Sequence, residues 1–321
     1  MIDFKTHDEQ IEILRNRGMI IPDDSSVKEF LLLNNYYNVI NGFKDIFIQQ
    51  GKTPEMFISG VSFNELFALY TFDKKLRQLL SQLLIVIERS FASIIAYEFS
   101  NSFRNHDDSY LDVNNYNLNI FNTDKATGQQ YILANELIFG DKGLKKSLEK
   151  LINENNPMIC HYKTKYNRIP LWVFINTISF GTLSIMYKCF QSRERGNIAK
   201  SFSQISGCNS YPNDIQKGIS VLVLLRNKCA HDQRVYDFNP HPTTIGNNDF
   251  LNTYLQPNQN KNTLFGAISC MSLFLKKTDF DYFVEILRKQ ITSLFSSIHS
   301  IPTQIILDKM GVPQAFLINN D

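Results

Sequence analysis

Apolar residues recur along most of the chain at intervals of three and four, the spacing that places them on one face of an α-helix. The longest such run predicts a helix extending to about Phe99, with one face formed by Leu76, Leu80, Leu83, Ile87, Phe91 and Ile94. Strand-like alternation of apolar and polar residues is scarce. Because helices average about 11–12 residues, we expect an all-α protein of roughly nine to eleven helices.

Helix starts are marked by Ser or Thr followed three residues later by Glu, the spacing of a capping box. Three such pairs are present, Thr6 with Glu9, Ser26 with Glu29 and Ser62 with Glu65. Prolines predict two later starts, one before a helix from Leu171, where Pro170 suits the first helical position, and one before a helix from Asp214 to about Ala230. Gly181 is expected to break or kink the first of these.

The predicted organisation is an N-terminal helical region, residues 1–60, followed by a helical domain over residues 61–321, together forming one compact unit. Residues 100–126, rich in Asn and Asp without a period, are expected to be a loop or insertion, and residues 237–262 a long connection. Three more helices are predicted after that connection, over Phe265–Leu275, Phe280–Ile298 and Gln304–Met310.

The composition is that of a globular protein, with 43% apolar and 20% charged residues. A net charge of +2 argues against a protein that binds nucleic acid over a wholly basic surface, but it permits a local basic patch. The five cysteines form no C-x-x-C pair, which favours a reducing cytoplasm over a disulfide framework or a zinc site. The start MIDFKTHDEQ lacks an apolar signal segment, and the uncharged stretch Leu171–Tyr187 is slightly short for a membrane span. We therefore expect a cytoplasmic protein without membrane contact.

The candidate chemistry lies in residues 224–237, LLRNKCAHDQRVYD, where an apolar run ends in a dense polar cluster. The planar guanidinium of Arg226 suits phosphate, and the imidazole of His231 can transfer protons near neutral pH. Together they could cleave RNA without a metal. The imidazole can take the proton from the 2′-hydroxyl or give a proton to the leaving 5′-oxygen, while the guanidinium stabilises the charge on the phosphate oxygens. The alternative is structural, since cations at a helix C-terminus also stabilise the helix dipole.

On an ideal helix Arg226 and His231 are about 140° apart, whereas Asn227 and His231 share a face. Either the helix unwinds near Ala230, or another element completes the cleft. A symmetric homodimer that faces two motifs across its axis would also supply a second histidine.

Several other residues are candidates for supporting roles. Glu88 lies on or near the apolar face of the long helix, so it either has a buried partner, Arg226 or Arg234, or faces water at the edge. Arg234 and Tyr236 could hold phosphate and stack on a base, or anchor the segment to the bundle. A weaker RNA-binding candidate, which could equally be a solvated face, is formed by Lys142, Lys145, Lys146, Lys163, Lys165 and Arg168. We find no glycine-rich phosphate loop and no metal-ligand motif, and we expect no cofactor or metal.

The string R-N-x-x-A-H-x-x-R-x-Y resembles the motif of the Abi family of bacterial abortive-infection proteins, the AbiD/AbiF-like group. That group is placed in the all-α HEPN superfamily, whose hallmark is R-x(4–6)-H. The segments EQIEILRNRGMII, FLLLNNYYNVINGF, the long helix beginning FNELFALY and IPLWVFINTISFGTLSIMY resemble the family in the same order. The resemblance extends from about residue 7 to 310.

The resemblance implies a HEPN-like helical bundle with N- and C-terminal elaborations, acting as a metal-independent endoribonuclease in defence against phage. It also implies a dimer and an RNA or protein antitoxin. Carried over, Arg226 and His231 fall on the catalytic pair and Asn227 on the polar residue that often follows the Arg. Asp232 and Asp237 stand where many relatives have His or Asn. The alternative function is a non-catalytic module that binds RNA or protein; a nucleotide transferase is remote because no phosphate loop is present.

Overall fold

The computed structural model describes residues 3–104, 108–124, 127–241, 245, 255 and 259–318. Its α-helices in these residues are α1 (His7–Asn16), α2 (Asp24–Leu33), α3 (Phe63–Ser102), α4 (Leu144–Asn153), α5 (Pro157–Tyr166), α6 (Leu171–Phe174), α7 (Phe180–Cys189), α8 (Ser192–Ser206), α9 (Pro212–Ala230), α10 (Leu264–Met271), α11 (Lys277–Phe295) and α12 (Thr303–Met310). The only strands in the described part are β1 (Phe121–Thr123) and β2 (Gln130–Ile132), an antiparallel pair. The prediction of an all-α class is confirmed, with one helix more than the expected upper number.

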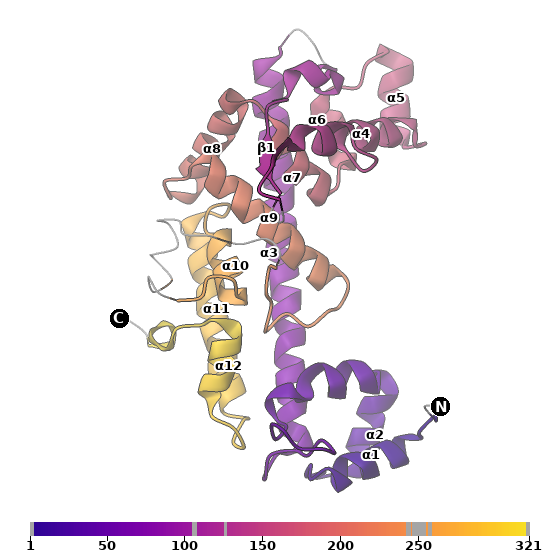
Figure 1. The fold of residues 1–321 in the computed structure, drawn as a ribbon, viewed down its shortest axis with the longest axis vertical. Coiled ribbons are helices and arrows are strands. Elements are labelled where there is room, and N and C mark those ends of the chain that lie inside the picture. Colours follow the sequence, from indigo (N-terminus) through magenta and orange to yellow (C-terminus); the bar gives the residue numbers. More distant parts are fainter. Residues whose placement is uncertain are drawn as a thin grey trace.

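Helix α3 is the spine of the molecule and runs through most of its length (Figure 1). Its 40 residues span about 60 Å at a rise of about 1.5 Å per residue. The predicted capping box is present, since the Glu65 carboxylate accepts from the Ser62 backbone N–H at 3.1 Å. By length and apolar composition alone α3 could cross a membrane; in the structure it packs against α8, α9 and α11. The buried stripe includes Leu84 and Ile95, whereas the predicted Leu83 and Ile94 lie at its edge.

The N-terminal region packs on the first turns of α3, at the end of the molecule where α1 and α2 lie (Figure 1). The capping box of Thr6 with Glu9 is confirmed. The predicted box at Ser26 is wrong, because Asp23 accepts from the backbone N–H groups of Ser25 and Ser26 and starts α2 earlier. An aspartate directly before the helix supplies two acceptor oxygens to the unpaired N–H groups of the first turn. Helix α2 ends at Leu33, and Tyr37 begins a separate π-helical turn, Tyr37–Asn41.

The other end of the molecule holds the hairpin β1–β2 and helices α4 to α7 (Figure 1). The predicted loop at 100–126 begins later than expected, since α3 continues to Ser102, and its described remainder contains short 3₁₀ turns and β1. The uncharged stretch from Leu171 is not one helix: α6 and a 3₁₀ turn, Ile175–Thr177, end before Ser179. The Ser179 hydroxyl accepts from the Thr182 N–H and caps α7, so Gly181 lies inside the first turn and is not the break.

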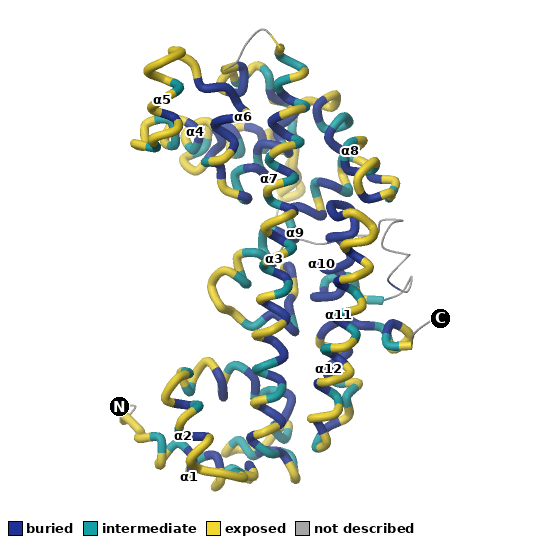
Figure 2. The backbone as a smooth tube through the Cα atoms, turned by 180° about the vertical axis from the view of Figure 1, so that it is seen from behind, coloured by how far each residue is buried: buried dark blue, intermediate teal, exposed yellow. Residues whose placement is uncertain are grey.

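Helices α9 and α10 form the centre of the core. All eight residues of α10 are buried, as the dark blue of this helix in Figure 2 shows, and α10 packs against α9. Phe91 of α3 makes ring contacts with Phe180, Tyr187, Phe202 and Phe274, which joins α3, α7, α8 and the segment after α10. The buried apolar residues form one continuous cluster. The predicted boundary at residue 60 remains a prediction, and most of the predicted connection over residues 237–262 lies outside the described residues.

Candidate active site at the end of helix α9

Helix α9 ends directly before His231 in a Schellman motif, the arrangement in which a left-handed residue closes the last turn. Asp232 has φ +53°, its N–H donates to the Cys229 carbonyl at 3.3 Å, and the Gln233 N–H donates to the Lys228 carbonyl at 3.0 Å. His231 still donates its N–H to the Asn227 carbonyl at 3.0 Å. The chain therefore keeps helical hydrogen bonding through His231 and reverses only after it. The helix does not unwind before the histidine.

Arg226 is held by Glu88, which α3 presents to it across the helix interface. The Nη2 atom lies 3.1 Å and 3.3 Å from the two carboxylate oxygens of Glu88, and Nε lies 3.3 Å from one of them. Nη1 donates to the side-chain oxygen of Asn227 at 3.2 Å. Both partners are partly open, with 34% of the Arg226 side chain and 21% of the Glu88 side chain exposed. The fork-to-carboxylate geometry fixes the guanidinium plane while leaving one edge in contact with solvent.

His231 is exposed, and within the described residues its side chain makes no hydrogen bond or ion pair. An exposed imidazole is accessible to substrate, but no neighbour among the described residues orients it. Beside Arg226, α3 contributes Glu88. One chain supplies one histidine of the motif to this surface.

The segment after His231 is held in place by hydrogen bonds and an ion pair with two buried residues of α3, Asp73 and Arg77. One carboxylate oxygen of Asp73 accepts from the backbone N–H groups of Val235 at 2.9 Å and Tyr236 at 2.7 Å. Arg77 donates from Nη1 to the Asp232 carbonyl at 2.9 Å and places Nη2 2.9 Å from the Asp232 carboxylate. These contacts hold both ends of the segment that follows His231.

Asp73 is fully buried, and this burial raises the pKa of its carboxyl to about 6, against the opposing effect of the two backbone N–H groups and Arg77. The sequence analysis did not single out Asp73 or Arg77. Their signal was a pair of opposite charges four residues apart within the apolar stripe of the long helix, where a charge needs a partner.

Arg234 and Tyr236 anchor the end of the motif to the N-terminal region. Arg234 donates to the Gly42 carbonyl, to Asp45 at 3.0 Å and to Asp237 at 2.9 Å. Tyr236 is fully buried, with its ring stacked on Phe43 at 6.0 Å. Of the two roles considered for Tyr236, the structure favours the anchor, because the ring has no open face for a base.

The two acidic departures from the family motif are both paired with arginine. The Asp232 carboxylate faces Arg77, and the Asp237 carboxylate faces Arg234. Their charges are therefore offset inside this chain, which reduces the repulsion that a bound phosphate backbone would meet.

The candidate lysines lie apart from this site. Lys145 and Lys146 are on α4, Lys163 and Lys165 are on α5, and these helices pack against α7 and α6. Lys142 precedes α4, which begins at Leu144. Lys146 is paired with Asp141 at 2.6 Å, and Arg168 follows α5. Nothing in their placement connects them to Arg226.

The described residues contain no group of three or more His, Cys, Asp or Glu side chains arranged to hold a metal ion. The fold and the site together define a mostly helical protein that presents an arginine held by a glutamate and an exposed histidine at the end of a central helix. The family model for Abi-like proteins matches residues 29–237, more than half of the 321 residues, and the chain belongs to this family. No curated protein and no solved structure gives a significant match.

The matched region begins within α2 and ends at Asp237, directly after the last residue of the motif, Tyr236. It therefore includes α3 and α9, together with Arg77 and Arg234, which hold the segment after His231. Helices α10 to α12 lie outside the matched region. Membership of the Abi-like family suggests a role in abortive infection, a form of defence against phage.

Proposed function

We propose that this protein is a metal-independent endoribonuclease of the HEPN type that acts in abortive infection. The observation that carries the proposal is the bidentate contact of Arg226 with Glu88, which orients a partly exposed guanidinium five residues before the exposed His231. An RNA or protein antitoxin that restrains the enzyme, and a cytoplasmic location, belong to the same proposal.

In the proposed reaction the 2′-oxygen of a ribose attacks the adjacent phosphorus, and the bond from phosphorus to the 5′-oxygen breaks. One histidine takes the proton of the 2′-hydroxyl, and another gives a proton to the leaving 5′-oxygen. The products are a 2′,3′-cyclic phosphate and a 5′-hydroxyl, so protons and bonds balance. Such proton transfer contributes about 10²–10⁴-fold to the rate.

Arg226 stabilises the charge that grows on the phosphate oxygens during attack. A guanidinium has five N–H donors, and the four hydrogen bonds to Glu88 and Asn227 leave at least one for phosphate. Because Glu88 fixes the guanidinium before substrate arrives, little reorganisation is needed in the transition state. Asn227 and Glu88 are positioning residues in this scheme.

The experiment that tests the proposal uses purified protein, an end-labelled single-stranded RNA and excess EDTA. We expect fragments that carry 2′,3′-cyclic phosphate and 5′-hydroxyl ends, and no cutting of DNA of the same sequence, because DNA lacks the 2′-hydroxyl. Cutting of DNA, or fragments with 5′-phosphate ends, would contradict the mechanism.

The alternative function, a non-catalytic module that binds RNA or protein, is favoured by one observation. His231 lacks a side-chain partner in the described residues, so none of these residues orients it as a base. Retention of the RNA on the protein without any cleavage in the same experiment would support this alternative.

A second copy of the chain would supply the second histidine, and one face beside the site is suited to it. Ile85 and Val86, one turn before Glu88 on α3, are 48% and 49% exposed. Apolar side chains of this size next to a partly buried ion pair are the kind of surface that a homodimer covers. We propose that this face packs against its copy across a two-fold axis.

Val86→Lys is expected to convert the dimer into a monomer and to reduce RNA cleavage at least tenfold, because one motif lacks its partner. Light scattering measures the mass, and the labelled RNA assay measures the activity. Ile132→Lys, which changes an aliphatic residue of similar exposure on β2, is the matched control and should keep both. A fully active Val86→Lys monomer would contradict the proposed dimer.

A further inference from the structure

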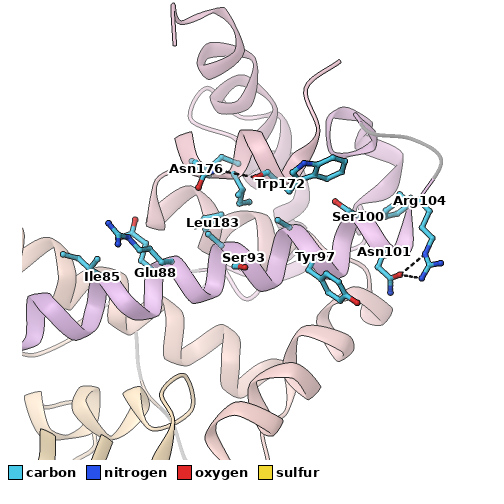
Figure 3. Close-up of a pocket in the computed structure, with 16 residues that line it drawn as sticks. Ile85, Glu88, Ser93, Tyr97, Ser100, Asn101, Arg104, Trp172, Asn176 and Leu183 are labelled. Carbon is cyan, nitrogen blue, oxygen red and sulfur yellow. Dashed lines mark hydrogen bonds between the residues drawn. The ribbon is translucent and has the colours of Figure 1, made fainter. Parts of the chain in front are cut away.

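A groove runs along the C-terminal half of α3, and Glu88, the partner of Arg226, lines it near one end. Its volume is about 1220 Å³, above the range of roughly 300–1,000 Å³ typical of small-molecule pockets. One wall is α3 itself, and the other is formed by α6, the 3₁₀ turn after it and the start of α7. Figure 3 shows Glu88 near one end of the groove and Arg104 near the other. The groove therefore leads away from the candidate catalytic arginine.

Two large aromatic rings stand open in this groove. Trp172, at the start of α6, is 52% exposed, and Tyr97 of α3 is 69% exposed. In Figure 3 the indole lies above α3 and the phenol on its lower side, between Ser93 and Asn101. Folding gains nothing from leaving rings of this size uncovered, whereas stacking on a flat ligand would bury them. Its place at the start of α6, two residues after Pro170, accounts for the position of Trp172 but not for the exposure of its ring.

The charges in the groove favour an anionic ligand. Arg89 and Arg104 line it, and within the described residues neither forms an ion pair. Among the described residues, the Arg104 side chain donates hydrogen bonds to the Asn101 side-chain oxygen, at 2.9 Å from Nε. Glu88 is the one acidic residue of the lining, and its charge is offset by Arg226. Open rings between unpaired cations are the arrangement that binds single-stranded nucleic acid.

We propose that this groove holds the single-stranded RNA on one side of the bond that is cut, with bases stacked on Trp172 and Tyr97. This inference rests on the proposed function, because it assigns the substrate strand to the surface next to Arg226. From Glu88 to Ser102, where α3 ends, the helix rises about 21 Å at about 1.5 Å per residue, which matches about six stacked nucleotides at about 3.4 Å each. Arg89 and Arg104 then contact the backbone near the two ends.

The strand must be unpaired for this contact. In a duplex the base faces are already stacked inside the helix, and a protein reaches only the groove edges and the backbone. Stacking on aromatic side chains tolerates different bases, so the groove would select single strands without selecting a sequence.

Trp172 is the only tryptophan of the chain, so its fluorescence reports directly on the groove. The probe is an eight-nucleotide RNA with 2′-O-methyl groups, which removes the attacking hydroxyl and lets the wild-type protein be titrated without cleavage. We expect saturable quenching of the fluorescence, weakened by added salt, and no saturable quenching by a duplex of the same length. Absence of quenching by the single strand would overturn the proposal.

Binding is measured independently by the anisotropy of a labelled oligonucleotide. Trp172→Ala and Tyr97→Ala are each expected to raise Kd roughly tenfold, and Arg89→Glu by a similar factor. The matched controls are Tyr282→Ala, a tyrosine 67% exposed on α11, and Lys52→Glu, an exposed cation near α1, and neither should change Kd. Unchanged Kd in Trp172→Ala and Tyr97→Ala would contradict the assignment.

The outcomes separate this inference from the nuclease itself. If RNA is cleaved but the groove variants change neither Kd nor KM, the nuclease proposal is supported and the assignment of RNA to the groove is contradicted. If single strands quench the fluorescence but no cleavage occurs, the groove assignment is supported and the nuclease proposal is contradicted. A change in the mass of the free protein in Trp172→Ala, measured by light scattering, would identify the groove as a contact between copies and overturn the RNA assignment.

Discussion

His231→Ala is expected to lower the rate of RNA cleavage by about 10²–10⁴-fold, because the imidazole supplies the proton transfers of the reaction. Arg226→Ala is expected to lower it by about 10²–10³-fold, because the phosphate loses its positioned donor. Cells that express the wild-type protein should show fragmented RNA and arrested growth, and both effects should disappear in each variant. Gel analysis of total RNA and growth curves measure the two effects.

The controls address folding and charge. His241→Ala replaces an exposed histidine ten residues away from His231 and should leave the rate unchanged. Arg226→Ala leaves the carboxylate of Glu88 without its cation, so the thermal midpoint of this variant is compared with that of the double variant with Glu88→Gln. Arrested growth that persists in both His231→Ala and Arg226→Ala, with RNA still cut, would end the nuclease proposal.

Arg77→Ala is expected to lower the free energy of unfolding by about 3–5 kcal/mol, the usual effect of removing one partner from a buried ion pair. Asp73 would be left fully buried without a cation, and the segment after His231 would lose two of its ties. Urea unfolding followed by circular dichroism measures the loss. We also expect cleavage to fall under conditions in which the variant is still folded, because the turn that presents His231 is released.

The matched control is Lys74→Ala, which removes an exposed cation from the adjacent turn of α3 and should change the stability by less than about 0.5 kcal/mol. Arg77→Lys keeps a charge near Asp73 but lacks the fork that also reaches Asp232, and an intermediate stability is expected. A loss of less than about 1 kcal/mol in Arg77→Ala would show that the pair does not hold the motif.

The local features of the fold were the most predictable. The apolar period identified α3 and α9, and the capping boxes at Thr6 and Ser62 start the helices that they predicted. Such features depend on residues within one turn of each other, so a short stretch of sequence contains all the interactions that form them. The capping box predicted at Ser26 was wrong for an equally local reason, because Asp23, three residues earlier, caps α2 instead.

The partners across the fold were less predictable. Glu88 was expected to pair with Arg226 or Arg234, and only the structure chose Arg226. Asp73 and Arg77 were missed, although they hold the turn after His231. These contacts join residues 138 to 163 positions apart, and their pairing depends on the relative shift and rotation of α3 and α9. A periodic pattern gives the buried face of each helix but not the residue that it meets.

The amino-acid sequence by itself determined the helical class, most of the helix starts, the chemistry available in residues 226–237 and the resemblance to the Abi family. The tertiary structure decided which carboxylate orients Arg226, that Tyr236 is buried, and that open rings and unpaired cations line a groove next to the site. Chemical groups and helical periods are encoded along the chain, whereas burial and neighbours arise only when the packing of α3 against α6, α7 and α9 sets the helices in register.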